Sequence, residues 1–179
     1  MKWGARIFGI LAGILLLYLL VGLLLPGTWT ATEEAALPAP PSAVYPFLSR
    51  ISAWEAWTPF PEAGLEVFGP PDGVGAGVQW DDPRYGKGEA RIVEARQDTA
   101  IGYEVLIEGG SLKIRGWLTL IPEGEGSRVQ WVEEGDFGWN PLMGYAAKGM
   151  ASSQGEAMKS SLVRLAAAVA RRRPDPTAP

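Results

Sequence analysis

Residues 100–134 read AIGYEVLIEGGSLKIRGWLTLIPEGEGSRVQWVEE, and this stretch decides the fold class. Apolar and polar residues alternate along Ser111–Ile121, which is the pattern of a strand with one buried face. Gly109-Gly110 and the segment 122–127, PEGEGS, have the composition of tight turns. The stretch therefore predicts three consecutive antiparallel strands over 100–108, 111–121 and 128–134.

The residues before this stretch continue the pattern of strands and turns. Further strands are predicted over 28–37, 65–68, 78–81 and 86–97, with short helices over 42–49 and 51–57. Pro46 predicts that the first of these helices is short or kinked. The segment 73–77, GVGAG, resembles half of a phosphate-binding loop, but a strand and not a helix follows it, so we interpret it as a turn.

The C-terminal part has the periodicity of one long helix. Apolar residues recur at steps of three and four from Met143 to Val169, and Asn140-Pro141 is a typical helix start. Gly144, Gly149 and Gly155 predict a break or a loose start in its first half. Residues 171–179 are expected to form a disordered tail. Helices kept apart from a run of antiparallel strands predict a single α+β domain over residues 28–170.

An apolar segment precedes the domain. Residues 7–25 contain no charge and no proline, and as a helix they reach roughly 28 Å, close to the thickness of a bilayer core. A cleaved signal peptide is the alternative, but its apolar region would be shorter. Lys2 and Arg6 precede the segment, so the positive-inside rule places residues 1–6 in the cytoplasm and the domain on the other side of the membrane.

Composition excludes several function classes. The chain of 179 residues has no His and no Cys, which removes thiol nucleophiles, disulfides and the usual general base. Its net charge of −4 argues against a nucleic-acid partner. We recognise no metal-binding pattern and expect no cofactor.

Four segments carry a resemblance to a known group of proteins. They are Ala39–Phe60 (APPSAVYPFLSRISAWEAWTPF), Gly69–Trp80, Gly86–Glu94 and Gly126–Asp136 (GSRVQWVEEGD). Their order resembles the START-like, Bet v 1-like superfamily, and within it the bacterial polyketide cyclase/dehydrase group called SRPBCC. The resemblance implies a helix-grip fold, in which a curved antiparallel sheet of six to seven strands wraps around the C-terminal helix and a pocket lies between them. The resemblance implies that the domain binds a ligand, but it does not imply one particular reaction. Where catalysis is proposed for members of the group, it often depends on a pocket residue such as His, and this chain has no His.

Aromatic and methionine side chains are the candidates for the pocket wall, and ordinary core packing is the alternative for each. The predicted pocket residues are Trp54, Trp57, Trp80, Tyr103, Trp117, Trp131, Met143, Tyr145 and Met150. No residue is predicted to be catalytic outright. Glu104 and Glu133 are candidates for acid–base work because each lies in a strand beside apolar residues, and Tyr103 could act with them. Arg91 and Arg115 could hold an anionic group, or could lie on a solvated strand face.

Three functions remain open from the sequence. The first is a membrane-anchored domain that binds a small apolar or amphipathic ligand, such as a lipid. The second is a cyclase or dehydratase that uses a pocket carboxylate and a tyrosine. The third is a structural protein that docks a partner through an exposed apolar surface. No protein partner can be named from the sequence.

Overall fold

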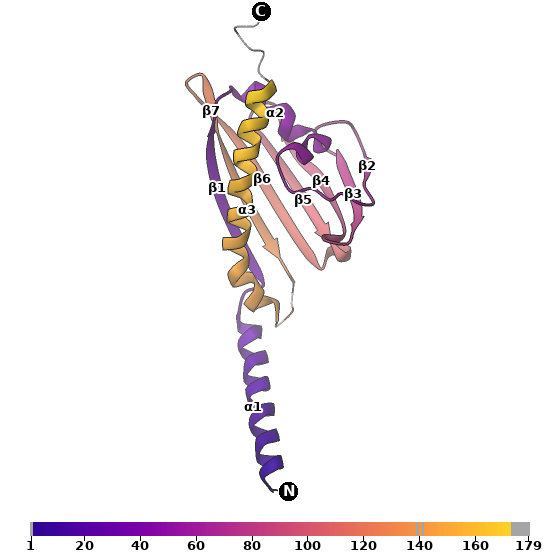
Figure 1. The fold of residues 1–179 in the computed structure, drawn as a ribbon, viewed down its shortest axis with the longest axis vertical. Coiled ribbons are helices and arrows are strands. Elements are labelled where there is room, and N and C mark those ends of the chain that lie inside the picture. The colour runs from indigo at the N-terminus through magenta and orange to yellow at the C-terminus, as the bar shows by residue number, and fades with distance from the viewer. Residues whose placement is uncertain (1, 139, 141, 173–179) are drawn as a thin grey trace, which may run out of the picture.

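The structure is a computed structural model that describes residues 2–138, 140 and 142–172 (Figure 1). Its helices are α1 (Lys2–Leu24), α2 (Pro41–Ser49) and α3 (Met143–Arg172), with short 3₁₀ turns η1 (Ile51–Ala56) and η2 (Glu108–Gly110). Its strands are β1 (Thr28–Leu37), β2 (Glu66–Phe68), β3 (Gly77–Asp82), β4 (Gly86–Arg96), β5 (Ala100–Ile107), β6 (Leu112–Glu123) and β7 (Gly126–Asp136).

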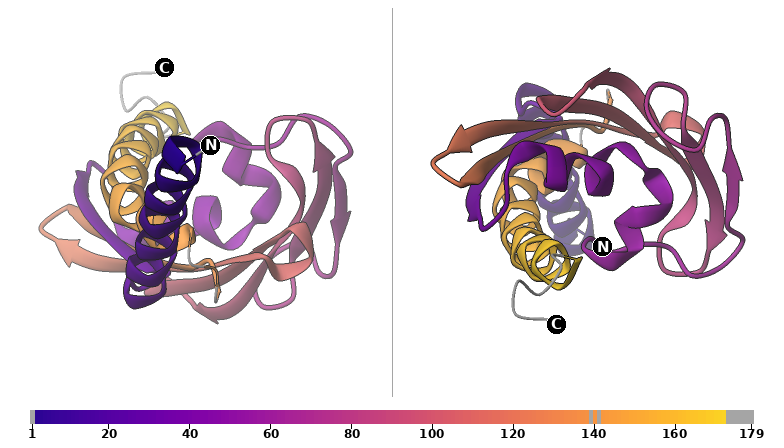
Figure 2. Two further views of the ribbon diagram at one scale, coloured as in Figure 1. Left: turned by 90° about the horizontal axis from the view of Figure 1, so that it is seen from below. Right: turned by 90° about the horizontal axis from the view of Figure 1, so that it is seen from above.

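The seven strands form one antiparallel sheet in the order β1-β7-β6-β5-β4-β3-β2. Consecutive strands from β2 to β7 pair with each other, and β1 closes the far edge by pairing with β7. Figure 2 shows the sheet curling around one side of the domain, while α3, α2 and η1 lie along the open side. This is the α+β helix-grip architecture that the sequence predicts.

Strand alternation decides which side chains enter the core. In β7, Val129, Trp131 and Glu133 are buried, whereas their neighbours Gln130 and Glu134 are exposed. Side chains two residues apart lie on the same face of a strand, so these three buried side chains share one face. That face is turned toward α3, since Gln154 of α3 donates a hydrogen bond to Glu133. The inner face of the sheet and the buried side of α3 therefore form the core together.

Helix α3 is continuous from Met143 to Arg172, so the break expected from its glycines is wrong. A Cβ on Gly144 would lie 2.6 Å from Cβ of Leu25, and a Cβ on Gly155 would lie 3.0 Å from a carboxylate oxygen of Glu33. Both glycines allow the helix to approach a neighbouring element closely, so packing offsets their low helix propensity. Of the expected helix start, Pro141 lies outside the described residues, and Asn140 Oδ1 accepts a hydrogen bond from the Leu142 N–H.

The connection between β5 and β6 also differs from the expected two-residue turn. It is the η2 turn, in which Glu108, Gly109 and Gly110 all have positive φ. Three left-handed residues in succession reverse the chain without a regular hairpin turn. The side-chain faces of β5 and β6 are unaffected, because their register remains unbroken.

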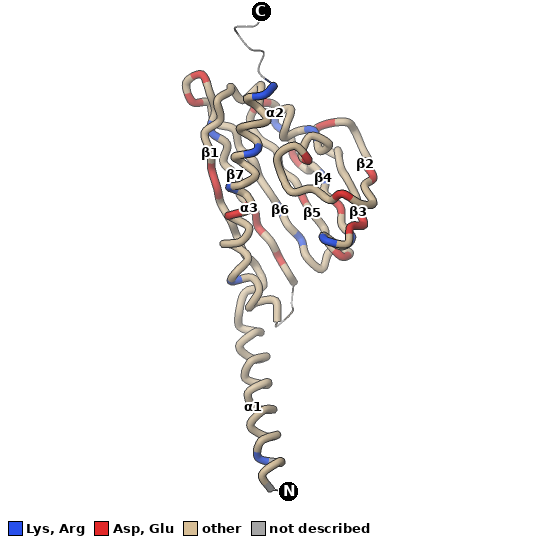
Figure 3. The backbone as a smooth tube through the Cα atoms, in the orientation of Figure 1, with Lys and Arg blue, Asp and Glu red and all other residues tan. Residues whose placement is uncertain are grey.

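Helix α1 projects from the domain and contains one stretch, Arg6–Leu24, that is long and apolar enough to cross a membrane, with a mean hydropathy of 2.8. It carries no charged residue between Ile7 and Leu24 (Figure 3). Its C-terminal end touches the start of α3. The Tyr145 ring stacks on the Tyr18 ring with centroids 4.4 Å apart, and the Tyr145 hydroxyl donates to the Tyr18 carbonyl oxygen at 2.8 Å.

Candidate functional site: an aromatic cavity between the sheet and α3

A cavity of about 380 Å³ lies between the inner face of the sheet and α3. Its volume falls in the range that small-molecule sites occupy. Seven aromatic side chains line it: Trp54, Trp57, Phe60, Trp80, Tyr85, Tyr103 and Trp131. The strands contribute aliphatic residues, and α3 contributes Gln154, Ala157, Met158 and Ser161.

The two tryptophans of the η1 region are held by the backbone of α2. The Trp54 indole N–H donates to the Leu48 carbonyl at 2.9 Å, and the Trp57 indole N–H donates to the Phe47 carbonyl at 3.1 Å. These bonds satisfy the polar end of each ring in the core and leave ring carbon atoms to line the cavity. Trp57 also meets Trp131 edge-on, with centroids 5.6 Å apart.

A polar cluster interrupts this apolar wall, and Gly116 makes it possible. The Tyr103 ring crosses over Gly116 on the next strand, where a Cβ would lie 2.0 Å from the ring. The Tyr103 hydroxyl therefore reaches Glu133 one strand further on and donates to its Oε1. The Trp131 indole N–H donates to the same hydroxyl oxygen at 2.8 Å, and Gln154 of α3 donates to the other carboxylate oxygen of Glu133.

Burial dominates the electrostatics of this cluster. Glu133 is 5% exposed, and the loss of solvation raises its pKa above the ordinary carboxyl value, although the hydrogen bonds from Tyr103 and Gln154 oppose the rise. Burial also raises the pKa of Tyr103 well above its ordinary value, and the adjacent Glu133 charge adds to the shift. Tyr103 is thus held as a neutral donor to the carboxylate.

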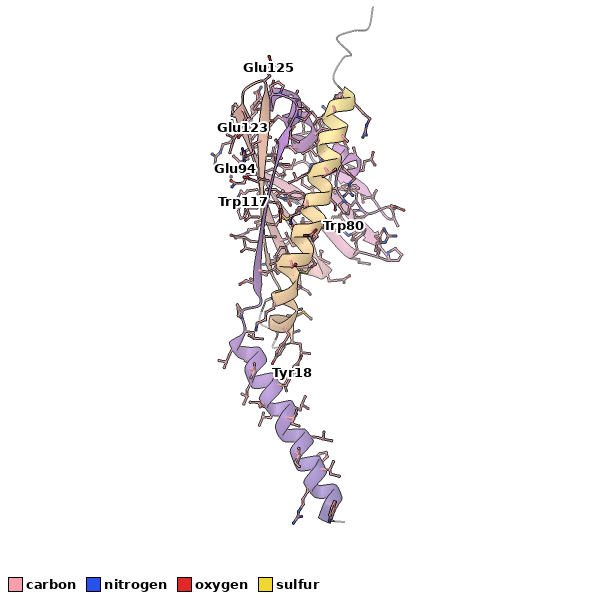
Figure 4. All side chains as sticks on the ribbon, turned by 60° about the vertical axis from the view of Figure 1, so that its left-hand side comes forward. Tyr18, Trp80, Glu94, Trp117, Glu123 and Glu125 are labelled. Carbon is pink, nitrogen blue, oxygen red and sulfur yellow. The ribbon has the colours of Figure 1, made fainter. Side chains whose placement is uncertain are left out.

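Five of the nine predicted pocket residues line this cavity: Trp54, Trp57, Trp80, Tyr103 and Trp131. Trp117 does not, since it projects from the other face of β6 and is 37% exposed. Figure 4 shows Trp117 on the side of the sheet away from α3, together with Glu94. Tyr145 packs on α1 instead, and neither Met143 nor Met150 lines the cavity.

The charged candidates divide in the same way. Glu133 lines the cavity, whereas Glu104 lies on the outer face and accepts a hydrogen bond from Arg115 at 2.9 Å. Arg91 lies across from Glu104 in the sheet register, with its guanidinium 5.2 Å from the Phe68 ring centroid. Glu104, Arg91 and Arg115 therefore belong to the outer face of the sheet.

Sequence reasoning missed several lining residues. Phe60 and Tyr85 come from loops, where no periodicity marks a buried face. Gln154 and Ala157 lie three residues apart on α3, and their helical spacing indicates a shared face without indicating that the face meets a cavity. Among the described residues, no group of three or more His, Cys, Asp or Glu could hold a metal ion.

The buried carboxylate of Asp82 joins two segments at the rim of the cavity. Asp82 Oδ1 accepts from the Arg84 N–H at 2.8 Å, and its Oδ2 accepts from the N–H groups of Glu62 and Ala63 at 3.0 and 3.1 Å. These backbone bonds lower the pKa of Asp82 below its ordinary value. They tie the loop after Pro61 to the turn that carries Tyr85, so both sides of the rim are fixed to each other.

The fold matches known proteins. A protein from Chromobacterium violaceum has 24% identity and a TM-score of 0.55, covering 82% of this chain and 98% of its own. A Thermus thermophilus protein has 21% identity and a TM-score of 0.61, covering 81% and 99%. Norcoclaurine synthase from Thalictrum flavum, in complex with dopamine and hydroxybenzaldehyde, has 13% identity and a TM-score of 0.60, covering 83% and 90%. These identities establish a shared fold alone.

Sequence comparison identifies the family. No curated protein sequence matches the chain. Residues 28–170, the segment expected to form the domain, match the family model described as polyketide cyclase / dehydrase and lipid transport. The chain belongs to that family.

Proposed function

We propose that this chain is a membrane-tethered binding domain that holds a small, largely apolar or amphipathic molecule in the cavity between the sheet and α3. The observation that carries the proposal is the cavity of about 380 Å³ walled by seven aromatic side chains. Removing apolar surface from water contributes roughly 25 cal/mol per Å², so such a wall supplies affinity without a chemical step. The norcoclaurine synthase complex provides a precedent in the same fold for small aromatic ligands.

The junction between α1 and α3 supports a position of the cavity close to the membrane surface. Tyr145 contacts Tyr18, so the two residues lie at the same height along the molecule. Tyr18 is six residues before Leu24, the last residue of α1, which places both tyrosines about 9 Å before the end of that helix. The cavity residues Gln154–Ser161 lie nine to sixteen residues further along α3, or roughly 14–24 Å from Tyr145. Because α3 runs away from α1 (Figure 1), the cavity lies roughly 5–15 Å beyond the apolar helix. A ligand that comes from the bilayer therefore has to leave the hydrocarbon layer to enter.

Native mass spectrometry of the full chain, released from maltoside micelles, tests the proposal. We expect an adduct that dissociates as one small molecule. The variant Ala157→Phe adds a ring on the cavity side of α3 and should lose the adduct. Val163→Phe is the matched control, because Val163 is 70% exposed on the same helix. An adduct that survives Ala157→Phe would place the ligand elsewhere and contradict the proposal.

A second candidate function is proton transfer on a bound carbonyl compound, favoured by the meeting of Glu133 and Tyr103 beside the cavity. Glu133 would act as the base. The binding function is preferred for two reasons. The Tyr103 hydroxyl already donates its proton in a hydrogen bond to Glu133, and the raised pKa of Tyr103 makes this hydroxyl a weak acid. Exchange of carbon-bound protons of phenylacetone in heavy water, followed by NMR, separates the two functions. Wild-type exchange no faster than that of Glu133→Gln would exclude this candidate for such ketones.

A further inference from the structure

The cavity contains an acidic group, Glu133, and no basic side chain lines it among the described residues. Glu133, Tyr103 and Tyr85 are the ionisable residues among the described side chains that line it, and no Lys or Arg is among those lining residues. An ionised carboxylate in an apolar environment is costly unless a cation or several hydrogen bonds compensate it. The electrostatics of the cavity therefore depend on how the Glu133 carboxylate is compensated.

The hydrogen bonds around Glu133 favour its ionised form. The indole N–H of Trp131 can only donate, and it occupies the Tyr103 oxygen, so the Tyr103 proton is directed to Glu133 Oε1. Gln154 donates to Oε2. Each carboxylate oxygen can accept more than one hydrogen bond, so capacity remains on both for a donor from a ligand.

Two basic side chains of α3, Lys159 and Arg164, contact groups other than Glu133. Lys159 is 55% exposed and contacts Glu156 and Glu33 at 3.1 and 3.7 Å. Arg164 donates to the Trp57 carbonyl and to Ser161. It lies ten residues beyond Gln154, or roughly 15 Å further along the helix. Neither residue compensates Glu133 within the cavity.

The aromatic wall adds a second attraction for positive charge. Trp54 meets the Tyr103 ring edge-on at 4.9 Å, and Trp57 and Trp131 continue the same wall. Aromatic rings attract ammonium groups through their quadrupoles, most strongly where water is excluded. A carboxylate beside several such rings suits a ligand with one positively charged nitrogen on an apolar body.

We propose that the ligand of this cavity is an organic ammonium compound, whose positively charged nitrogen lies against Glu133 and whose apolar part fills the aromatic cavity. The inference rests on the proposed binding function and specifies its ligand class. Lipids with an amino or quaternary ammonium group and soluble aromatic amines share this chemistry.

Calorimetric titration of the full chain in maltoside micelles tests the inference with two probes that differ in one group, phenylbutylamine and phenylbutanol. We expect the amine to bind wild type about tenfold more tightly than the alcohol. Glu133→Gln should remove this preference. Glu134→Gln is the matched control, because Glu134 is exposed on the opposite face of β7 and should keep the preference.

The outcomes separate the ligand class from the binding function. Equal affinities for the two probes, or tighter binding of the alcohol, would overturn the inference and leave a binding cavity in place. Binding of neither probe to wild type would overturn both. A preference for the amine that persists in Glu133→Gln would also overturn the assignment to this carboxylate. The wild-type comparison decides the ligand class even if Glu133→Gln does not fold.

Discussion

At the scale of single residues, adjacent positions have opposite roles. Glu133 lies in the core and Glu134 in solvent, and in β5 Tyr103 lies in the core while Glu104 pairs with Arg115 on the outer face. The two buried residues, Tyr103 and Glu133, contact each other because Gly116 on the strand between them has no side chain to obstruct the Tyr103 ring. A buried polar cluster of this kind is stable only while its donors and acceptors remain paired.

The buried carboxylate should leave a signature in the pH dependence of stability. Because the pKa of Glu133 is raised in the folded state, its stabilising contribution is complete below the unfolded value of about 4.5 and is lost as pH rises through the folded pKa. The difference in unfolding free energy, wild type minus Glu133→Gln, should therefore fall as pH rises above about 4.5. Denaturant titration of both full-length proteins at a series of pH values measures this difference. A difference that increases with pH would mean that the folded pKa is lowered.

At the scale of elements, α3 illustrates how packing overrides propensity. Periodicity alone predicts a helix over these residues, and the glycines predict an interruption. Gly144 and Gly155 instead sit at close approaches to Leu25 and Glu33, while a Cβ on Gly149 would have nothing within 4 Å. Glycine is thus required at position 144, lies against a movable side chain at position 155, and is dispensable at position 149.

Substitution of these glycines should separate the two cases. Gly149→Ala should stabilise the protein by about 0.5–1 kcal/mol, since alanine loses less backbone entropy in a helix. Gly144→Ala should destabilise it, because the new methyl group would collide with Leu25 and displace the start of α3 from α1. Thermal unfolding of the full chain in micelles measures both. Equal shifts of the same sign would show that propensity alone governs this part of α3.

At the scale of the whole molecule, the domain contacts the apolar helix α1 through the stacked rings of Tyr18 and Tyr145. This contact joins the segment proposed to lie in the membrane directly to the helix that covers the cavity. Helix α3 therefore connects the two parts, and the proposed distance of the cavity from the membrane depends on where the cavity residues lie along this helix.

The proposed orientation has its own test. Lys2 and Arg6 before the apolar run should keep the N-terminus in the cytoplasm, so a reporter fused after Pro179 should be active outside the cytoplasm. Alkaline phosphatase and green fluorescent protein fusions report the two sides in opposite ways. The double variant Lys2→Glu, Arg6→Glu should weaken this orientation. Fluorescence from the wild-type fusion in the cytoplasm would contradict the proposal.

The sequence by itself determined the antiparallel strands, the apolar N-terminal helix, the long C-terminal helix and the resemblance to the family. These features depend on local periodicity and composition, which the chain carries in any fold. Only the tertiary structure decided that Trp131 lines the cavity while Trp117 does not, and that Glu133 rather than Glu104 is buried. Alternation defines two faces of a strand, but register and the position of α3 choose which face becomes the inside. Loop residues such as Phe60 and Tyr85 have no such pattern, so only the assembled fold brings them to the site.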